Sequence, residues 1–209
     1  MTTIHYEKEV NVKASYDVIV AGSGPAGICA AVAAARNGSN VALVERYGVV
    51  GGNLTAGYVG PVLGMVGKGT MRDELVNLLG IPENDMIGET GKAHDFERAK
   101  LVLAEFVDRE NIDVYLQSAV YDVIKEGNAV KGLILATNEG QFALTASVVI
   151  DATGDAVVSY LAGADVEKGR EDGLMQPVTL EFTVDGVDEN KGVICIGDVD
   201  DVKLGDERF

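Results

Sequence analysis

Cysteine is scarce in this sequence: Cys29 and Cys195 are the only two among 209 residues. They form no CxxC pair and no zinc-ligand spacing, so the sequence indicates neither a thiol redox motif nor a metal site. Cys29 lies in an apolar run, where its ordinary role is that of a small core residue. This composition suits a reducing compartment, and we expect a cytoplasmic protein.

Basic residues are also few, since 17 Lys and Arg stand against 33 Asp and Glu and leave a formal net charge of −16. Such a charge repels nucleic-acid phosphates and anionic lipids, so we expect no nucleic-acid partner and no membrane partner. Long apolar runs are missing as well. The N-terminus has no apolar signal-peptide core, and the stretch around residues 28–35 is too short and too rich in alanine to span a bilayer.

What the sequence does contain is typical of a folded globular protein, with 47% hydrophobic and 24% charged residues. A length of 209 residues suits one large domain, or one domain with part of a second. The 26 glycines are spread along the chain and indicate many tight turns.

A short buried strand is predicted at residues 16–21, where β-branched residues end at a glycine. The motif that follows reads GSGPAG and consists of Gly22, Ser23, Gly24, Pro25, Ala26 and Gly27. Gly22 allows the turn, Gly24 lets a pyrophosphate approach the backbone, and Gly27 lets the next helix pack against the sheet. The unpaired N–H groups at the helix N-terminus then attract the phosphates.

The residues after the motif complete a βαβ unit. An Ala-rich helix runs to Asn37, Gly38 ends it, and residues 41–44 form a second buried strand. Glu45 follows where an acid is expected to hydrogen-bond the adenosine ribose, which disfavours the 2′-phosphate of NADP. These features predict a dinucleotide site, and the alternative is a Rossmann-like fold that holds no nucleotide.

The segment after Glu45 favours FAD over NAD. It continues with Arg46 and then with GGNLT, which consists of Gly51, Gly52, Asn53, Leu54 and Thr55. The sequence here resembles the FAD-dependent oxidoreductases of the glutathione-reductase-like Rossmann type. In that family such a segment wraps the pyrophosphate and the ribityl chain, so the resemblance implies FAD as the cofactor. A flexible glycine loop is the alternative.

Two helices are predicted at residues 68–79 and 95–110, where apolar residues recur at helical spacing. The turn-rich stretch between them is an exposed connection or a lid over the cofactor. His94, one of only two histidines, stands at the predicted helix start, where a surface or capping role is expected. Met71 and Met86 are expected to be packing or loop residues.

Short strands separated by turns form a predicted β-meander at about residues 112–147. The resemblance implies that the meander precedes the last parallel strand, residues 148–150, and that the backbone of Val120 meets the adenine. That strand leads into a second expected FAD contact, which consists of Ala152, Thr153, Gly154 and Asp155. Asp155 could equally cap the following helix, and the two roles are compatible.

The resemblance covers nearly the whole chain but only about the first half of a usual family member. It implies an FAD-binding domain at residues 1–165 and the incomplete start of a substrate or cap domain at residues 166–209. Gln176 and Pro177 are then expected near the flavin ring. The stretch GVICIGD resembles an FAD motif of thioredoxin-reductase-type flavoproteins, in which Asp198 would bind a ribityl hydroxyl, and a plain strand and turn is the alternative.

Together these features predict an α/β fold: a Rossmann-type FAD/NAD(P)-binding parallel sheet with a β-meander insertion and the start of a second, substrate domain. The predicted function is FAD-dependent oxidation or reduction of a small-molecule substrate by hydride transfer. The alternatives are a non-catalytic or split FAD-binding subunit that needs another chain, and an NAD-dependent dehydrogenase. No catalytic acid or base stands out, although Tyr58 is a weak candidate. An exposed apolar surface around residues 174–184 predicts a homo-oligomer or a complementing second chain.

Overall fold

The computed structural model describes residues 2–60, 62, 69–81, 94–176 and 178–180, together with the backbone of residues 203–204 and 207–208. The chain divides into two compact units, residues 1–176 and residues 177–209. In the second unit, β7 (Lys203–Leu204) pairs antiparallel with β8 (Glu207–Arg208). The expected domain boundary after residue 165 stays a prediction.

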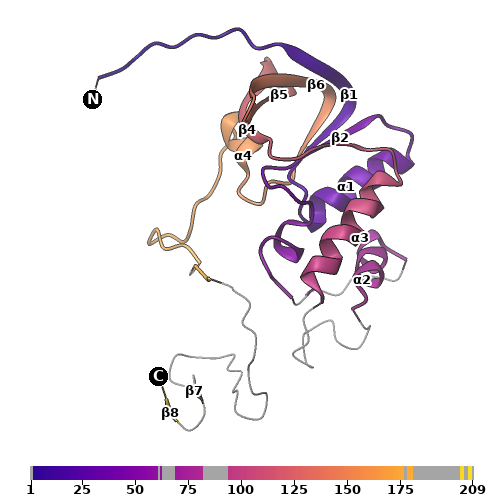
Figure 1. The fold of residues 1–209 in the computed structure, drawn as a ribbon. Coiled ribbons are helices and arrows are strands. Elements are labelled where there is room, and N and C mark those ends of the chain that lie inside the picture. The colour runs from indigo at the N-terminus through magenta and orange to yellow at the C-terminus, as the bar shows by residue number, and fades with distance from the viewer. Residues whose placement is uncertain are drawn as a thin grey trace. The chain divides into compact units, whose positions relative to one another are not determined.

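A six-stranded mixed sheet forms the centre of the first unit, in the order β3-β2-β1-β6-β5-β4 (Figure 1). The strands are β1 (Val12–Ala21), β2 (Val41–Val44), β3 (Asp113–Tyr115), β4 (Ala119–Glu126), β5 (Ala129–Thr137) and β6 (Gly140–Asp151). β1 pairs in parallel with β2 and β6, and β2 pairs in parallel with β3. β5 is antiparallel to both β4 and β6.

The observed sheet differs from the predicted meander in two places. β3 was expected within the meander, but it pairs in parallel with β2 at the edge of the sheet. The separate strand expected at residues 148–150 is the end of β6, which pairs with β5 through its first half and with β1 along its length. The sequence FALTASVVI contains no glycine or proline that would interrupt β6.

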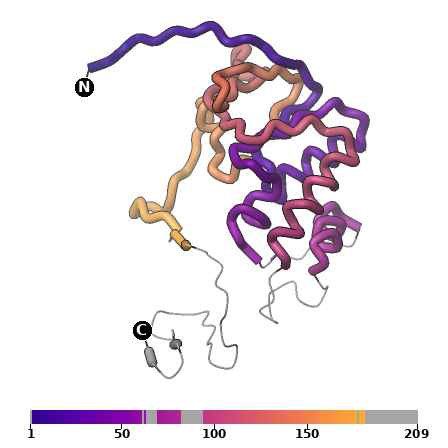
Figure 2. The backbone as a smooth tube through the Cα atoms, in the orientation of Figure 1, coloured from indigo at the N-terminus to yellow at the C-terminus, as the bar shows by residue number. Residues whose placement is uncertain are grey.

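Helices cover one face of this sheet. They are α1 (Pro25–Arg36), α2 (Met71–Leu79) and α3 (Phe96–Asp108), and Figure 2 shows them packed side by side. The predicted helices at residues 68–79 and 95–110 are therefore confirmed with slightly shorter bounds. α2 ends at Gly80 in the left-handed conformation, and α3 begins at Asp95, whose carboxylate accepts the Arg98 N–H at 2.9 Å.

Alternate residues of β1 and β2 are buried on opposite faces, as expected of strands inside a parallel sheet. Val20 and Leu43 pack toward the helices in a core that also contains Leu103 of α3. Ile19 and its neighbours pack on the other face against Leu133 of β5, because the β4–β5–β6 part of the sheet curls over that face (Figure 1). A short helix, α4 (Val157–Leu161), packs against β4 and β6.

Two glycines allow α1 to lie close to the sheet. A Cβ on Gly27 would stand 1.8 Å from the carbonyl oxygen of Gly22, and a Cβ on Gly22 would stand 2.4 Å from that of Ala152. Gly22 also has a φ of +94°, which side chains other than glycine rarely adopt. The turn, α1 and the end of β6 can therefore meet only where both positions lack a side chain.

Candidate functional site

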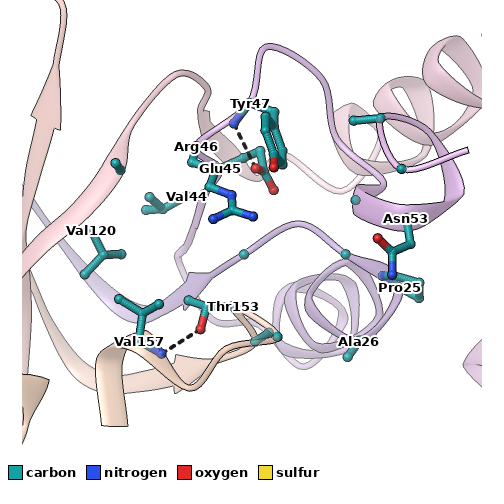
Figure 3. Close-up of a pocket in the computed structure, with 18 of the residues that line it drawn as sticks. Pro25, Ala26, Val44, Glu45, Arg46, Tyr47, Asn53, Val120, Thr153 and Val157 are labelled. Carbon is teal, nitrogen blue, oxygen red and sulfur yellow. Dashed lines mark hydrogen bonds between the residues drawn. The ribbon is translucent and has the colours of Figure 1, made fainter. Parts of the chain in front are cut away.

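A cavity of about 490 Å³ opens at the carboxyl ends of β1, β2 and β6. This is the edge where open α/β sheets bind their ligands. Figure 3 shows Val44, Glu45, Arg46 and Tyr47 on one side of the cavity, with Thr153 and Val157 facing them across it. Pro25, Ala26 and Asn53 close one end of the cavity, and Val120 lies toward the other.

The N-terminus of α1 forms one wall of the cavity and has no side-chain cap. Gly24 is the N-cap residue, and Pro25 occupies the first helical position, where its missing N–H costs no hydrogen bond. A Cβ built on Gly24 would meet nothing within 4 Å, so the space above this backbone is open. The first turn of α1 therefore presents N–H groups to a space that fits a pyrophosphate.

Glu45 lines the cavity although only 5% of its surface is exposed. Its Oε2 accepts hydrogen bonds from the N–H of Ser23 at 2.9 Å and from Ser23 Oγ at 2.6 Å. Its Oε1 accepts the N–H of Tyr47 at 2.9 Å, which Figure 3 draws as a dashed line. These bonds stabilise the buried carboxylate and fix it between the glycine turn and the end of β2.

Arg46 and Tyr47 follow Glu45 along the side of the cavity. The guanidinium carbon of Arg46 lies 4.8 Å from the centroid of the Tyr47 ring, within the range of a cation–π contact. Both side chains are exposed. They form a planar, cationic surface beside the buried carboxylate.

The GGNLT segment contributes unequally to the cavity. Gly52 and Asn53 line it, in the short 3₁₀ turn η1 (Gly52–Leu54). Gly51 is buried and donates its N–H to the Ser23 carbonyl at 2.8 Å, and Leu54 is buried in the core. Thr55 Oγ1 donates to the Val50 carbonyl at 2.7 Å. Gly51, Leu54 and Thr55 therefore attach the segment to the surrounding structure, and Gly52 and Asn53 face the cavity.

The turn after β6 forms the wall opposite Glu45. Ala152 donates its N–H to the Ala21 carbonyl at 2.8 Å, and Thr153 Oγ1 accepts the N–H of Val157 at 2.9 Å, which Figure 3 also marks. Burial alone would raise the pKa of Asp151. Hydrogen bonds from the backbone and hydroxyl groups of Ser159 and Thr153 outweigh burial and hold the pKa of Asp151 below its ordinary value.

Asp155 does not cap the helix that follows. It is exposed, and the residue before α4 is Ala156, a left-handed residue with no side-chain cap. Thr153 takes the capping role instead, because its hydroxyl accepts the N–H of Val157. The predicted capping role of Asp155 is therefore wrong.

The structure brings most of the predicted cofactor residues together around one cavity. Those that line it are Gly22, Gly24, Pro25, Ala26, Glu45, Arg46, Gly52, Asn53, Val120, Ala152, Thr153 and Gly154. Five predicted residues do not line it: Ser23, Gly27, Gly51, Leu54 and Asp155. The first four of these five are buried and support residues that do. The predicted contact of each residue with FAD stays a prediction.

Sequence reasoning missed several residues of the cavity wall, namely Val44, Tyr47, Ala56, Gly57, Ser118, Ala119 and Val157. All seven stand within three residues of a predicted site residue, and that adjacency was the one local signal for them. Ser118 and Ala119 come to the cavity because β3 lies beside β2, and the Ser118 N–H donates to the Glu45 carbonyl at 2.9 Å.

His94 is neither a surface residue nor a cap. It is 8% exposed, and its ring nitrogens face the carbonyl oxygens of Leu54 and Gly60. Asp95 is the cap of α3. Tyr58, the weak catalytic candidate, packs its ring against Phe96 with the centroids 4.9 Å apart, and it does not line the cavity.

Some predictions fall on residues outside those described, namely Met86, Pro177 and Asp198. Gln176 is described and exposed. Cys29 is half-buried against the helical core, as its predicted packing role requires, and burial raises the pKa of its thiol. Among the described residues, no helix is long and apolar enough to cross a membrane, and no cluster of side chains could hold a metal ion.

Comparison with known proteins gives a family match along most of the chain. A family model described as FAD dependent oxidoreductase matches residues 17–207. The soluble pyridine nucleotide transhydrogenase of Marinomonas sp. (strain MWYL1) is 30% identical over 152 residues, which cover 66% of this chain and 30% of that protein. Its counterpart in Chromohalobacter salexigens is 33% identical over 100 residues, which cover 45% of this chain and 20% of that protein.

Solved structures share the fold. THI4 of Thermovibrio ammonificans matches with a TM-score of 0.51 and 24% identity, over 70% of this chain and 61% of that one. The anhydrotetracycline hydroxylase OxyS of Streptomyces rimosus matches with a TM-score of 0.52 and 16% identity, over 75% of this chain and 35% of that one. These similarities confirm the predicted α/β fold with a Rossmann-type sheet.

Proposed function

The chain belongs to the FAD-dependent oxidoreductase family, and we propose that its cavity at the ends of β1, β2 and β6 holds the adenosine and pyrophosphate of FAD. Membership of this family confirms the predicted cofactor, FAD, and the predicted class of enzyme, an oxidoreductase. The chain spans less than a third of the curated relatives that it matches. The activity of the whole protein is therefore part of the proposal.

The observation that supports the proposal most strongly is the open space above Gly24 at the uncapped N-terminus of α1. An anion there would meet backbone N–H groups and the positive end of a twelve-residue helix. No cationic side chain is needed, and Gly24 leaves room for close approach. Gly52 and Asn53 line the cavity beside Gly24 and would also contact the pyrophosphate.

The remaining walls suit the adenosine. Glu45 Oε2 already accepts two hydrogen bonds, but Oε1 accepts only one and keeps a lone pair, so Oε1 can also accept a ribose hydroxyl. Val120 and Ala119 offer backbone and small apolar surface at one end of the cavity, where the adenine would lie.

We further propose that the whole protein oxidises or reduces a small molecule by hydride transfer. Bound FAD supplies the electron-transfer chemistry, and the residues of this chain bind the cofactor and orient it. The alternative is a split or non-catalytic FAD-binding subunit. It needs the same cavity, and it differs from an enzyme only in that it does not turn over substrate without another chain. Scarce cysteine favours a reducing compartment, and we propose the cytoplasm as the location.

A titration of the purified chain tests the proposed cofactor. We expect FAD to bind with one-to-one stoichiometry and to show a perturbed visible flavin spectrum. We expect ADP to compete with FAD, because ADP contains the adenosine and pyrophosphate for which the cavity is proposed. Failure of ADP to displace bound FAD would show that the described cavity is not the site.

We also propose that the chain works with a further polypeptide, either a second copy or a complementing chain. Among the described residues, no strand pairs with the second edge of β6 from Ala146 to Asp151, and Val148 on this segment is 51% exposed. Leu174, Val178 and Leu180 are also exposed. Open strand edges and exposed apolar side chains are typical of surfaces that pair with another chain.

Light scattering tests this partner proposal. We expect a mass above that of the 22.0 kDa chain, and we expect Val148→Lys to lower it toward the monomer without changing secondary structure. A stable monomer that binds FAD stoichiometrically and reduces it with a small-molecule donor would contradict the proposal.

A further inference from the structure

His94 is a buried polar side chain directly before α3, outside the wall of the cavity. Its Nε2 lies 2.7 Å from the carbonyl oxygen of Leu54, and its Nδ1 lies 3.3 Å from that of Gly60. Carbonyl oxygens only accept hydrogen bonds, so the ring must act as a donor. The shorter distance assigns the N–H to Nε2 when the ring is neutral.

The two carbonyl groups mark the ends of one loop, residues 54–60. Within it, Ala56 and Gly57 line the cavity, and the N–H of Val59 donates to the Asn53 carbonyl at 2.8 Å. Tyr58 has a φ of +53°, a left-handed conformation that is unfavourable for a tyrosine. A loop with such a residue needs support from outside itself to keep one shape.

The start of α3 supplies that support. The Phe96 ring lies 4.8 Å from the His94 ring and 4.9 Å from the Tyr58 ring, both edge to face. His94 adds the hydrogen bond to Leu54, forty positions earlier in the sequence. The contacts of the His94 and Phe96 rings thus connect the start of α3 to the loop that carries part of the cavity wall.

We propose that His94 is a positioning residue for the FAD site, which acts by donating its Nε2–H to the Leu54 carbonyl and so fixes loop 54–60 against the cavity. This inference rests on the proposed function. It assigns to His94 no contact with FAD, because His94 does not line the cavity.

Two amide side chains distinguish the two nitrogen positions of the ring. Glutamine places an NH₂ group near the position of Nε2, and asparagine places one near the position of Nδ1. We therefore expect His94→Gln to keep the bond to Leu54 and His94→Asn to lose it. His94→Phe keeps a ring but removes the N–H donor, and His5→Phe, at an exposed histidine, serves as the control.

The first measurement is hydrogen exchange in the protein without FAD. We expect backbone amides of residues 52–60 to exchange faster in His94→Asn and His94→Phe than in the wild type, while His94→Gln and His5→Phe keep wild-type exchange. Equal exchange in the Gln and Asn variants would overturn the assigned bond. This comparison stands even if the wild type fails to bind FAD, an outcome that would overturn the proposed function separately.

The second measurement is FAD affinity, with the FAD-induced rise in unfolding temperature. We expect His94→Asn to lose about tenfold in affinity and His94→Gln to stay close to the wild type, since one hydrogen bond differs. A merely structural role would lower the unfolding temperature without FAD and leave the FAD-induced rise unchanged. That pattern would overturn the proposal, and the Gln and Asn pair tests it even if His94→Phe does not fold.

Discussion

Glu45 is a buried carboxylate that is stabilised by hydrogen bonds from Ser23 and Tyr47. Leaving several buried donors without an acceptor is costly. We expect Glu45→Ala to lower the unfolding free energy of the FAD-free protein by about 2–4 kcal/mol, and Ser23→Ala by about 1–2 kcal/mol.

Because the two residues share a hydrogen bond, the double variant should lose less than the sum of the single losses. Urea unfolding of the wild type, the two single variants and the double variant measures these losses in unfolding free energy. Strict additivity would show that Ser23 does not hold Glu45 in solution.

The variant Gly24→Val tests whether the phosphates of FAD approach the N-terminus of α1 at this position. The φ of Gly24, −63°, is compatible with any side chain, and a Cβ there would meet no protein atom within 4 Å. We expect Gly24→Val to leave the unfolding temperature nearly unchanged and to weaken FAD binding by at least about tenfold, because the added methyl groups occupy the proposed phosphate space.

Gly48→Val is a matched control for that variant. Its Cβ would meet only the Gln117 side chain, at an ordinary 3.6 Å, and Gly48 does not line the cofactor cavity. Flavin fluorescence titration compares the two variants. Equal FAD affinity in both would contradict the role given to Gly24.

The role of a site residue could be predicted where it depends on residues close by in the sequence. It could not be predicted where the partners of the residue lie far away in the sequence. Gly22, Gly24 and Glu45 follow from one motif and its spacing, and the structure brings them to one cavity. His94 could not be assigned, since its partners lie 34 and 40 positions away. Asp155 competes locally with Thr153, and the hydroxyl of Thr153 takes the cap.

At the scale of elements, the junction between β6 and α4 depends on Asp151. The pKa of Asp151 is lowered in the folded protein, so its ionised form contributes stability at neutral pH. That contribution is present above the ordinary carboxyl pKa of about 3.9 and is lost as the pH falls through the lower folded value.

We therefore expect Asp151→Asn to be destabilised most at pH 7, and we expect its difference from the wild type to shrink below about pH 4. Urea unfolding at several pH values measures this difference. Asp155→Asn, at an exposed position on the same turn, is the control and should follow the wild type throughout. A deficit in Asp151→Asn that stays constant down to pH 2 would contradict the assignment.

Elements with a clear period or a motif could be predicted, whereas their pairing could not. The apolar runs give β2 its observed bounds and give β1 its end at Ala21, although β1 begins at Val12, four residues before the predicted start. The helical spacing in α2 and α3 gives these helices nearly correct bounds. The three residues of β3 read like a meander strand, because parallel and antiparallel pairing leave no different pattern in so short a segment. β6 pairs in parallel with β1 and antiparallel with β5, and only the observed register shows this double pairing.

At the scale of the whole molecule, the core around the cavity-bearing strands is complete, whereas the sheet beside the cavity has an open edge among the described residues. The helical core and the curled sheet bury both faces of β1 and β2. The second edge of β6 nevertheless stays open among the described residues, beside the turn that lines the cavity. The fold class and the cofactor follow from the sequence, whereas no motif in it specifies the substrate.

The central claim is that this cavity recognises the adenosine half of FAD. Its most direct test is a competition experiment, in which ADP or FMN is added to FAD bound to the purified chain, and the FAD that stays on the protein is measured by chromatography after equilibrium dialysis. We expect ADP to displace FAD from a single site and FMN, which lacks the adenosine, to do so far less well. Displacement by FMN as strong as that by ADP, or no saturable FAD binding at all, would contradict this claim.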